Sequence, residues 1–219
     1  DGFVAMPNFC GAEQLAGIED ALRRFMSRRL IELPSEHVFF EDTTDPSTLK
    51  QIQRLHNHDE FFGAFMAGAP RRLAEELLGE PVVGKNLQYF NKPPAIGQAT
   101  PPHQDGFYFM LEPCRALTMW MALDVVDAEN GCVRYVRGSH TRGMRPHGRT
   151  ETLGFSQGII DFGQPVDSEN EVACPAQPGD LLVHQALTIH RADANASATR
   201  NRRALGFIFY AESARENVA

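Results

Sequence analysis

Basic runs and long apolar runs are both missing from this sequence of 219 residues. No run of Lys and Arg exceeds two residues, and 28 acidic residues against 21 basic ones give a net charge of -7. This balance argues against a nucleic-acid partner. The sequence also contains no stretch of 18 apolar residues, so neither a transmembrane helix nor a membrane partner is predicted.

Cysteine is scarce as well. The four cysteines are far apart and form no C-x-x-C pair; they are Cys10, Cys114, Cys132 and Cys174. This spacing predicts reduced thiols in a cytoplasmic protein and argues against a disulfide framework or a zinc site. Because the chain starts at Asp1-Gly2-Phe3, inside a predicted strand, we expect the natural N-terminus to lie upstream.

Helical patterns are confined to the first third of the chain. In residues 11–29 the apolar side chains of Leu15, Ile18 and Leu22 recur at helical spacing and leave a polar reverse face. Two further helices are predicted at about residues 61–66 and 70–78, the second ending at a glycine.

Strand patterns dominate the remainder. Short β-branched or aromatic runs bounded by Gly, Pro or Asn occupy residues 82–90, 116–126, 132–136, 180–189 and 203–210, and one more run precedes Pro7. This order predicts an α+β, mainly β protein with a β-sandwich or jelly roll at its centre. We expect one domain over residues 1–219, helical at about 1–80 with a jelly-roll core at about 81–212.

Residues 141–176 carry little periodicity and many Gly, Arg, Glu and Asp residues. The stretch is longer than an ordinary connection between strands. Long ordered loops often serve as lids or binding loops, and we expect such a role here.

The most informative motif is His103-Gln104-Asp105, together with His190 much later in the chain. Two imidazoles and one carboxylate are the ligand set of the facial triad that holds Fe(II) and leaves three positions open. On a strand, residues i and i+2 project to the same face, so His103 and Asp105 can reach one ion. His190 is expected to end an apolar strand that pairs beside the strand of His103.

Three arginines stand close together beyond His190, at Arg200, Arg202 and Arg203. A guanidinium holds a carboxylate through two parallel hydrogen bonds, so one of them could bind a dicarboxylate cosubstrate. In an alternating strand Arg202 and Arg203 face opposite sides, so only one of these two points inward. A solvated strand edge is the alternative reading of this cluster.

Several other residues are candidates for a pocket. Asn86 and Gln88 share one strand face and suggest either a polar pocket or satisfied core amides, while Trp120 is either core or cavity wall. The aromatic side chains that follow the motif, Phe107, Tyr108 and Phe109, could form a wall for a substrate. His184 suits a supporting or a packing role.

The sequence resembles the phytanoyl-CoA dioxygenase family of non-haem iron, 2-oxoglutarate-dependent oxygenases. Spaced motifs that occur in the order of the family carry this resemblance: Lys92-Pro93-Pro94, His103-Gln104-Asp105, Trp120-Met121-Ala122-Leu123-Asp124, Glu129-Asn130-Gly131-Cys132, Arg137-Gly138-Ser139-His140, Pro178-Gly179-Asp180 and His190. The spacing from His190 to Arg202 is one residue longer than usual, so Arg200 and Arg203 stay open as alternatives. Arg191 stands where the family has a small residue.

The resemblance implies a cupin-like double-stranded β-helix with His103, Asp105 and His190 as iron ligands and catalytic residues. It implies that Arg202 holds the distal carboxylate of 2-oxoglutarate. Asn86, Gln88 and Trp120 match positions that border the cosubstrate, and Gln104 and Phe109 match positions that contact substrate.

The expected cofactors are therefore Fe(II), 2-oxoglutarate and O2, and the expected partner is a small-molecule substrate. The expected reaction is hydroxylation of a C–H bond with release of succinate and CO2. Oxidative cyclisation, desaturation and epoxidation use the same cofactors and are the first alternative. A catalytically silent jelly roll that binds a ligand is the second. The intact Asp105 argues against a halogenase, in which a small residue replaces the carboxylate.

Overall fold

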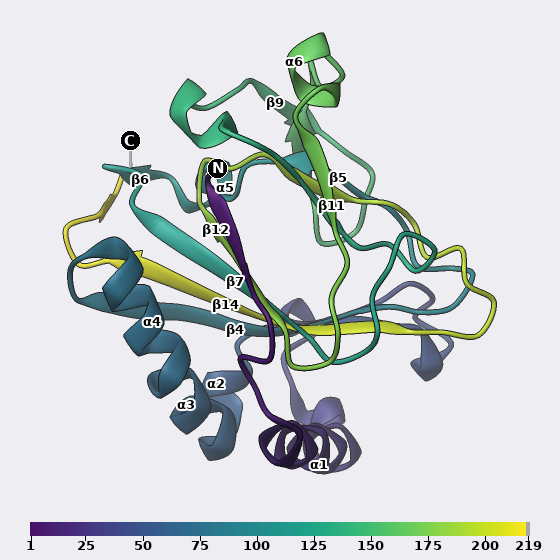
Figure 1. The fold of residues 1–219 in the computed structure, drawn as a ribbon. Coiled ribbons are helices and arrows are strands. Elements are labelled where there is room, and N and C mark those ends of the chain that lie inside the picture. The colour runs from purple at the N-terminus through teal and green to yellow at the C-terminus, as the bar shows by residue number, and fades with distance from the viewer. Residues whose placement is uncertain (218–219) are drawn as a thin grey trace.

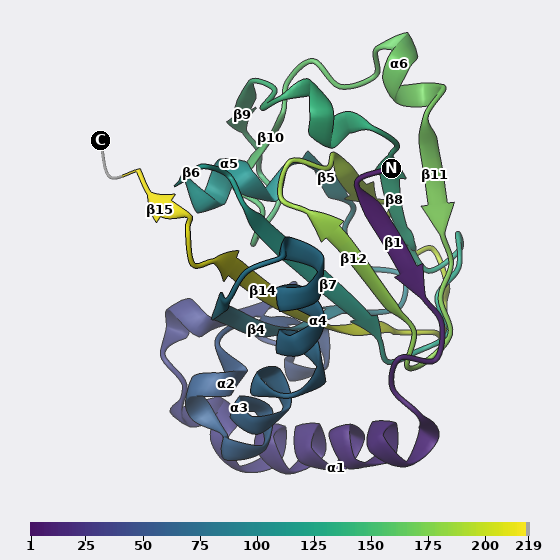
Figure 2. The same cartoon turned by 60° about the vertical axis from the view of Figure 1, so that its left-hand side comes forward.

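Two antiparallel sheets face each other in the computed structural model, which describes residues 1–217, and helices cover the outer side of the larger sheet (Figure 1). The larger sheet has seven strands in the order β1-β12-β7-β14-β4-β3-β2 (Figure 2). Their bounds are β1 Phe3–Met6, β2 Val38–Phe40, β3 Leu49–Ile52, β4 Val82–Lys92, β7 Ala116–Ala122, β12 Leu181–Gln185 and β14 Arg202–Ala211.

The smaller sheet has four strands in the order β11-β8-β13-β5. These strands are β5 Thr100–His103, β8 Val133–Val136, β11 Glu171–Cys174 and β13 His190–Ala192. Two short ribbons complete the β structure, one formed by β9 His147–Arg149 with β10 Gln157–Ile159 and one by β6 Leu111–Glu112 with β15 Arg215–Glu216. The predicted jelly-roll fold is confirmed.

The helices lie mainly in the first third of the chain. The α-helices are α1 Ala12–Arg29, α2 Leu55–His58, α3 Glu60–Ala67, α4 Ala69–Leu78, α5 Asp105–Phe109 and α6 Pro165–Ser168. The 3-10 turns are η1 Leu30–Glu32, η2 Ser35–His37, η3 Pro46–Thr48 and η4 Ser139–Arg142. The three predicted helices are confirmed, and α4 ends at Gly79 in the left-handed conformation (φ 71°) that glycine adopts without strain.

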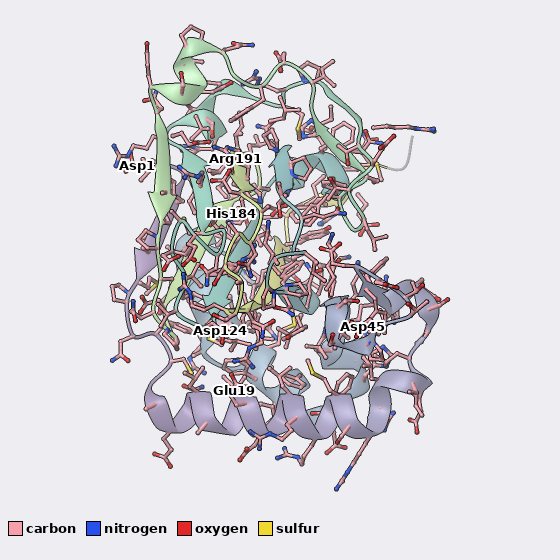
Figure 3. The ribbon with its side chains drawn as sticks, turned by 90° about the vertical axis from the view of Figure 1, so that its right-hand side faces the viewer. Asp1, Glu19, Asp45, Asp124, His184 and Arg191 are labelled. Carbon is pink, nitrogen blue, oxygen red and sulfur yellow. The ribbon has the colours of Figure 1, made fainter. Side chains whose placement is uncertain are left out.

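Strand alternation divides the side chains of the larger sheet between two cores. On β7, Met119 and Met121 join the core beneath the helices, while Trp120 and Ala122 face the smaller sheet. On β14, Phe207 joins the helix side. The helix side of the sheet also carries a charged cluster. Arg203 forms ion pairs with Asp124 (2.6 Å) and with Glu19 of α1 (2.9 Å), and Figure 3 labels these two acidic residues.

Three details differ from expectation. The first 80 residues are not only helical, because besides the predicted strand before Pro7, which is β1, they also supply β2 and β3 to the larger sheet. Residues 141–176 are not a simple loop: they form the β9–β10 hairpin, α6 and β11. The run at 180–189 ends as a strand at Gln185, and His190 begins the next strand rather than ending the first. Short strands such as β2 and β9 show too few residues to reveal a period of two.

Within the described residues, every helix is too short or too polar to cross a membrane. All four cysteines are free thiols, and three of them are buried. The expectation of reduced cysteines agrees with this structure, whereas the cytoplasmic location stays a prediction.

The contribution of the core beneath the helices to stability can be measured by substituting Phe207. Its side chain is fully buried, and its ring packs edge-on against Phe65 of α3 at 5.5 Å between centroids. We expect Phe207→Ala to lower the free energy of unfolding by about 3–5 kcal/mol, through lost burial and a residual cavity. Urea denaturation measures this change. Val83→Ala on the exposed side of β4 is the control, with an expected change below about 0.5 kcal/mol. Equal losses in both variants would contradict this account.

Candidate metal centre and cavity

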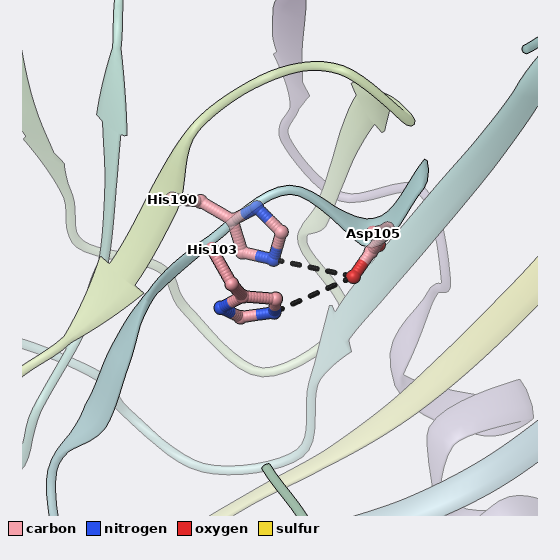
Figure 4. A group of neighbouring side chains, drawn as sticks. All are labelled: His103, Asp105 and His190. Atoms are coloured by element: carbon pink, nitrogen blue, oxygen red, sulfur yellow. Dashed lines mark ion pairs between the residues drawn. The ribbon is translucent and has the colours of Figure 1, made fainter. Parts of the chain in front are cut away.

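His103, Asp105 and His190 converge between the two sheets (Figure 4). One potential ligand atom from each lies within 4.8 Å of the others. The Nε2 atom of His103 is 3.4 Å from Asp105 Oδ1, and that of His190 is 3.7 Å from the same oxygen. Ligand atoms about 2 Å from one ion lie roughly 3 Å apart, so this arrangement can hold a metal after small adjustments.

Strand pairing brings the two histidines together. His103 is the last residue of β5 and lies directly opposite His190, the first residue of β13. Asp105 is not on the same strand as His103, as the i, i+2 argument assumed. Instead the chain turns after β5, and Asp105 is the first residue of α5. The expected convergence is thus reached through a strand-to-helix turn.

Backbone carbonyls fix the tautomer of both imidazoles. His103 Nδ1 lies 2.8 Å from the carbonyl of Pro101, and His190 Nδ1 lies 3.0 Å from that of Thr188. Because a carbonyl oxygen only accepts, each Nδ1 must carry the hydrogen. The lone pair of each Nε2 is therefore directed to Asp105 and free to bind a metal.

The second oxygen of Asp105 is held by protein groups. The Thr118 hydroxyl donates to Oδ2 at 2.5 Å, and His184 Nε2 lies 3.1 Å from the same atom. His184 Nδ1 is in turn 2.9 Å from the Tyr135 hydroxyl. Figure 3 places His184 near the middle of the molecule. Oδ1 remains directed to the two histidines, so Asp105 can bind an ion through one oxygen.

The ionisation of these groups suits metal binding. Burial raises the pKa of Asp105, but the imidazoles of His190, His103 and His184 outweigh burial and hold that pKa well below its usual value. Burial, reinforced by His103 and His184, holds the pKa of His190 well below its usual value. Metal ligands must be deprotonated, and at neutral pH the carboxylate is ionised and the His190 imidazole is neutral.

A cavity of about 260 Å³ opens beside these three residues. Five further predicted site residues line it, namely Asn86, Gln88, Phe109, Trp120 and Arg202. Tyr108 and Phe155 add aromatic surface, whereas Phe107 stacks on His147 with 4.3 Å between ring centroids.

Gln104 is fully buried and is absent from the cavity wall. Its side-chain nitrogen donates to the carbonyls of Gly143 and Leu187, and its oxygen accepts from the amide of Arg145. The amide is therefore used to anchor loops, and the contact of Gln104 with substrate stays a prediction.

The structure distinguishes the three arginines. Arg200 binds Asp127 and Glu129, and Arg203 binds Asp124 and Glu19. Arg202 lines the cavity, is 4% exposed, and has its guanidinium 5.3 Å from the centre of the Trp120 ring.

Arg202 differs from these two arginines, because no carboxylate among residues 1–217 forms an ion pair with its guanidinium. Its Nε atom is buried without a hydrogen-bond partner among residues 1–217, and burial lowers the pKa of the side chain to about 10. At neutral pH it remains a cation that faces the cavity. This is the property expected of a group that receives a carboxylate.

Lys92 also lines the cavity, although the sequence analysis predicted no functional role for it. It lies opposite Arg202 in the strand register, and its Nζ donates to the carbonyls of Gln98 (2.6 Å) and Asp193 (2.7 Å). Burial, followed by the nearby Arg202, lowers its pKa to about 6. The Lys92-Pro93-Pro94 motif was the sequence signal that could have identified it.

The fold and the triad define a class: a cupin-like jelly roll with two histidines and one carboxylate between its sheets. A sequence profile described as "Phytanoyl-CoA dioxygenase (PhyH)" matches residues 1–204. The chain belongs to the phytanoyl-CoA dioxygenase family.

Curated relatives agree with this assignment. Mouse "Phytanoyl-CoA dioxygenase domain-containing protein 1" is 30% identical over 65% of this chain and 50% of that protein. The "1-deoxypentalenic acid 11-beta-hydroxylase" of Streptomyces exfoliatus is 31% identical over 66% of this chain and 54% of that protein. The chain thus spans about half the length of the curated relatives it matches.

Solved structures share the fold. EvdO2 from Micromonospora carbonacea var. aurantiaca, complexed with 2-oxoglutarate, is 25% identical with a TM-score of 0.76, covering 100% of this chain and 89% of that one. The epimerase SnoN, in complex with Fe3+, alpha ketoglutarate and nogalamycin RO, is 23% identical with a TM-score of 0.79. That match covers 99% of this chain and 81% of that one.

Thr118→Val tests the support of Asp105. The change keeps the shape of the side chain but removes the hydroxyl that donates to Oδ2. Groups that orient a metal ligand are typically worth about 10- to 100-fold in affinity, and we expect a loss in this range for Fe(II). Anaerobic titration with Fe(II) measures it. Thr141→Val, at an exposed turn, is the control. An unchanged affinity would show that Asp105 needs no such donor.

Proposed function

We propose that this protein is an Fe(II)- and 2-oxoglutarate-dependent oxygenase that hydroxylates a small molecule. The observation that carries the proposal is the presence in one cavity of the triad and of a buried arginine without a carboxylate partner. Family membership and the iron- and 2-oxoglutarate-containing structures of similar fold support it.

The donor set fits ferrous iron. His103 and His190 would bind it through Nε2 and Asp105 through Oδ1, which leaves three positions for a bidentate keto acid and O2. When bound, iron and 2-oxoglutarate supply the oxidising power, with O2 consumed, 2-oxoglutarate converted to succinate and CO2, and a substrate C–H bond oxidised.

The cavity also fits 2-oxoglutarate. Thr118, which binds Asp105, and Trp120, which lies under Arg202, are two residues apart on β7 and share a face, a separation of about 7 Å. A five-carbon diacid can therefore have its keto-acid end at the metal and its far carboxylate at Arg202. Lys92 lies beside Arg202 and can gain a proton when a carboxylate approaches.

Protein side chains provide orientation and exclude water. Thr118 and His184 hold Asp105, while the rings of Trp120, Tyr108 and Phe155 cover the neighbouring wall. A dry wall limits oxidation of groups other than the bound substrate.

The outcome of the oxidation is the finer part of the proposal. Similar proteins are named as a hydroxylase, an epimerase and a carbocyclase, so one fold accompanies several outcomes. Hydroxylation is the proposal because it needs no second reactive group in the substrate, whereas cyclisation, desaturation and epoxidation need a specific one. A silent binding module would have no need for a complete triad and a free Arg202.

Turnover of the cosubstrate tests the proposal. Purified protein with Fe(II), ascorbate and O2 should convert 2-oxoglutarate to succinate slowly, even without substrate. We expect Asp105→Ala and His103→Ala to reduce this rate at least 100-fold while circular dichroism stays unchanged, because each removes one ligand atom. Succinate detected by mass spectrometry is the measurement, and His56→Ala is the control. The proposal fails if the variants keep wild-type turnover.

Arg202→Ala tests the carboxylate anchor. Losing a charge-assisted hydrogen bond costs roughly 1.5–3 kcal/mol, so the KM for 2-oxoglutarate should rise at least about tenfold. Arg203→Ala is a matched control, because its guanidinium already binds Asp124 and Glu19. It should lower thermal stability and leave the KM within about twofold. The reverse pattern would make Arg203 the anchor.

A further inference from the structure

Side-chain amides form part of the cavity wall away from the metal centre. Gln51 of β3 and Gln88 of β4 both line the cavity and are only 4% and 8% exposed. Gln51 lies opposite Phe90 in the register between β3 and β4, so it shares the inward face of Gln88.

The two amides contact each other but leave one acceptor free. Gln51 Nε2 donates to Gln88 Oε1 at 2.7 Å. Gln51 Oε1 is buried and has no hydrogen-bond partner among residues 1–217. A buried carbonyl oxygen without a donor lowers stability, so it is a group that a ligand with an O–H or N–H can satisfy.

This wall lies to one side of the space proposed for 2-oxoglutarate. In the larger sheet the strands follow the order β7, β14, β4 and β3, about 4.8 Å apart. Trp120 on β7 and Gln88 on β4 are both opposite Gly206 of β14. Gly206 has no side chain, and the ring of Phe90 from β4 lies over it and forms the cavity wall there.

One turn of the chain covers both the amide pair and the metal centre. A Cβ atom added to Gly154 would lie 2.8 Å from Gln51 Oε1, so this glycine lies directly against the amide. The next residue, Phe155, has its ring 5.2 Å from that of His103. A molecule bound to Gln51 therefore lies in the same compartment as the proposed iron.

Charge and size restrict the ligand. Lys50, the cation beside Gln51, is paired with the buried Glu41 at 3.2 Å, so it offers no free charge to an anion. The cavity of about 260 Å³ lies just below the range of roughly 300–1,000 Å³ that is typical of ligand pockets. Neither property suits the phosphates of an acyl-CoA or a long acyl chain.

We infer that Gln51 and Gln88 form a specificity subsite for a neutral, hydroxyl-bearing substrate of about ring size. The inference rests on the proposed function. One substrate hydroxyl donates to Gln51 Oε1 and a second accepts from Gln88 Nε2, while the ring packs against the aromatic wall and offers a C–H bond to the metal centre. The pair determines which molecule is bound, and Gln51 takes no part in binding iron or 2-oxoglutarate.

A matched probe series tests the subsite. Cyclohexanol, cyclohexane-1,2-diol and myo-inositol share one ring and differ in hydroxyl number, and decanoyl-CoA represents acyl substrates. Binding is measured by calorimetry on protein loaded with Ni(II) and 2-oxoglutarate, which cannot turn over. We expect the two polyhydroxylated probes to bind more tightly than cyclohexanol and decanoyl-CoA.

Two variants assign the preference to the amides. Gln51→Met and Gln88→Met keep chain length but remove the polar groups, and each should weaken binding of cyclohexane-1,2-diol at least tenfold. Gln14→Met, on the exposed side of α1, is the control for the substitution. The inference is overturned if the polyhydroxylated probes do not bind, if cyclohexanol or decanoyl-CoA binds as tightly, or if the variants keep the wild-type preference.

Succinate formation separates this inference from the proposed function. With Fe(II), Gln51→Met should keep the uncoupled rate and the KM for 2-oxoglutarate within about twofold. An absence of iron-dependent turnover in the wild type would overturn the proposed function. Normal turnover without a hydroxyl preference would overturn the subsite alone.

Discussion

The carboxylate of Asp105 is the group on which the centre of this molecule depends. It lies between the two sheets with its side chain 14% exposed, where an isolated negative charge would be costly. Thr118 of β7 and His184 of β12 hold one of its oxygens. The other oxygen faces the Nε2 atoms of His103 and His190, which the pairing of β5 with β13 places side by side, so the site depends on both sheets.

The larger sheet performs two tasks because its side chains alternate. Its outer face meets α1, α3 and α4 mainly through large apolar residues such as Phe207, with the ion pairs of Arg203 added. Its inner face carries Trp120 together with the polar residues Thr118, Gln88 and Arg202, and these three would destabilise an ordinary core. The helices thus allow the inner face to be polar, because the sheet is stabilised from the opposite side.

The sequence predicted the parts whose signal is local. The helices, the longer strands and the pair His103 and Asp105 follow from spacing or composition over a few residues. Which of Arg202 and Arg203 faces the cavity unpaired could not be read from sequence. It depends on Glu19 and Asp124, which lie far away in the sequence and form ion pairs with Arg203. Gln51 gave no signal, because all four residues of its strand are buried and show no alternation. For Gln104 the sequence could not separate two roles, since a buried amide can bind loop carbonyls as well as a ligand.

Charge balance explains why one arginine is left without a partner. Arg200 and Arg203 each face two carboxylates, whereas Arg202 brings an uncompensated positive charge to the cavity. Burial keeps Lys92 largely neutral, with a pKa of about 6. A ferrous ion would add two positive charges to the single negative charge of Asp105, so the compartment would carry a net charge of about +2 with Arg202. A dicarboxylate such as 2-oxoglutarate cancels this excess. The same reasoning disfavours a second anion, which agrees with a neutral substrate held by the uncharged amides of Gln51 and Gln88.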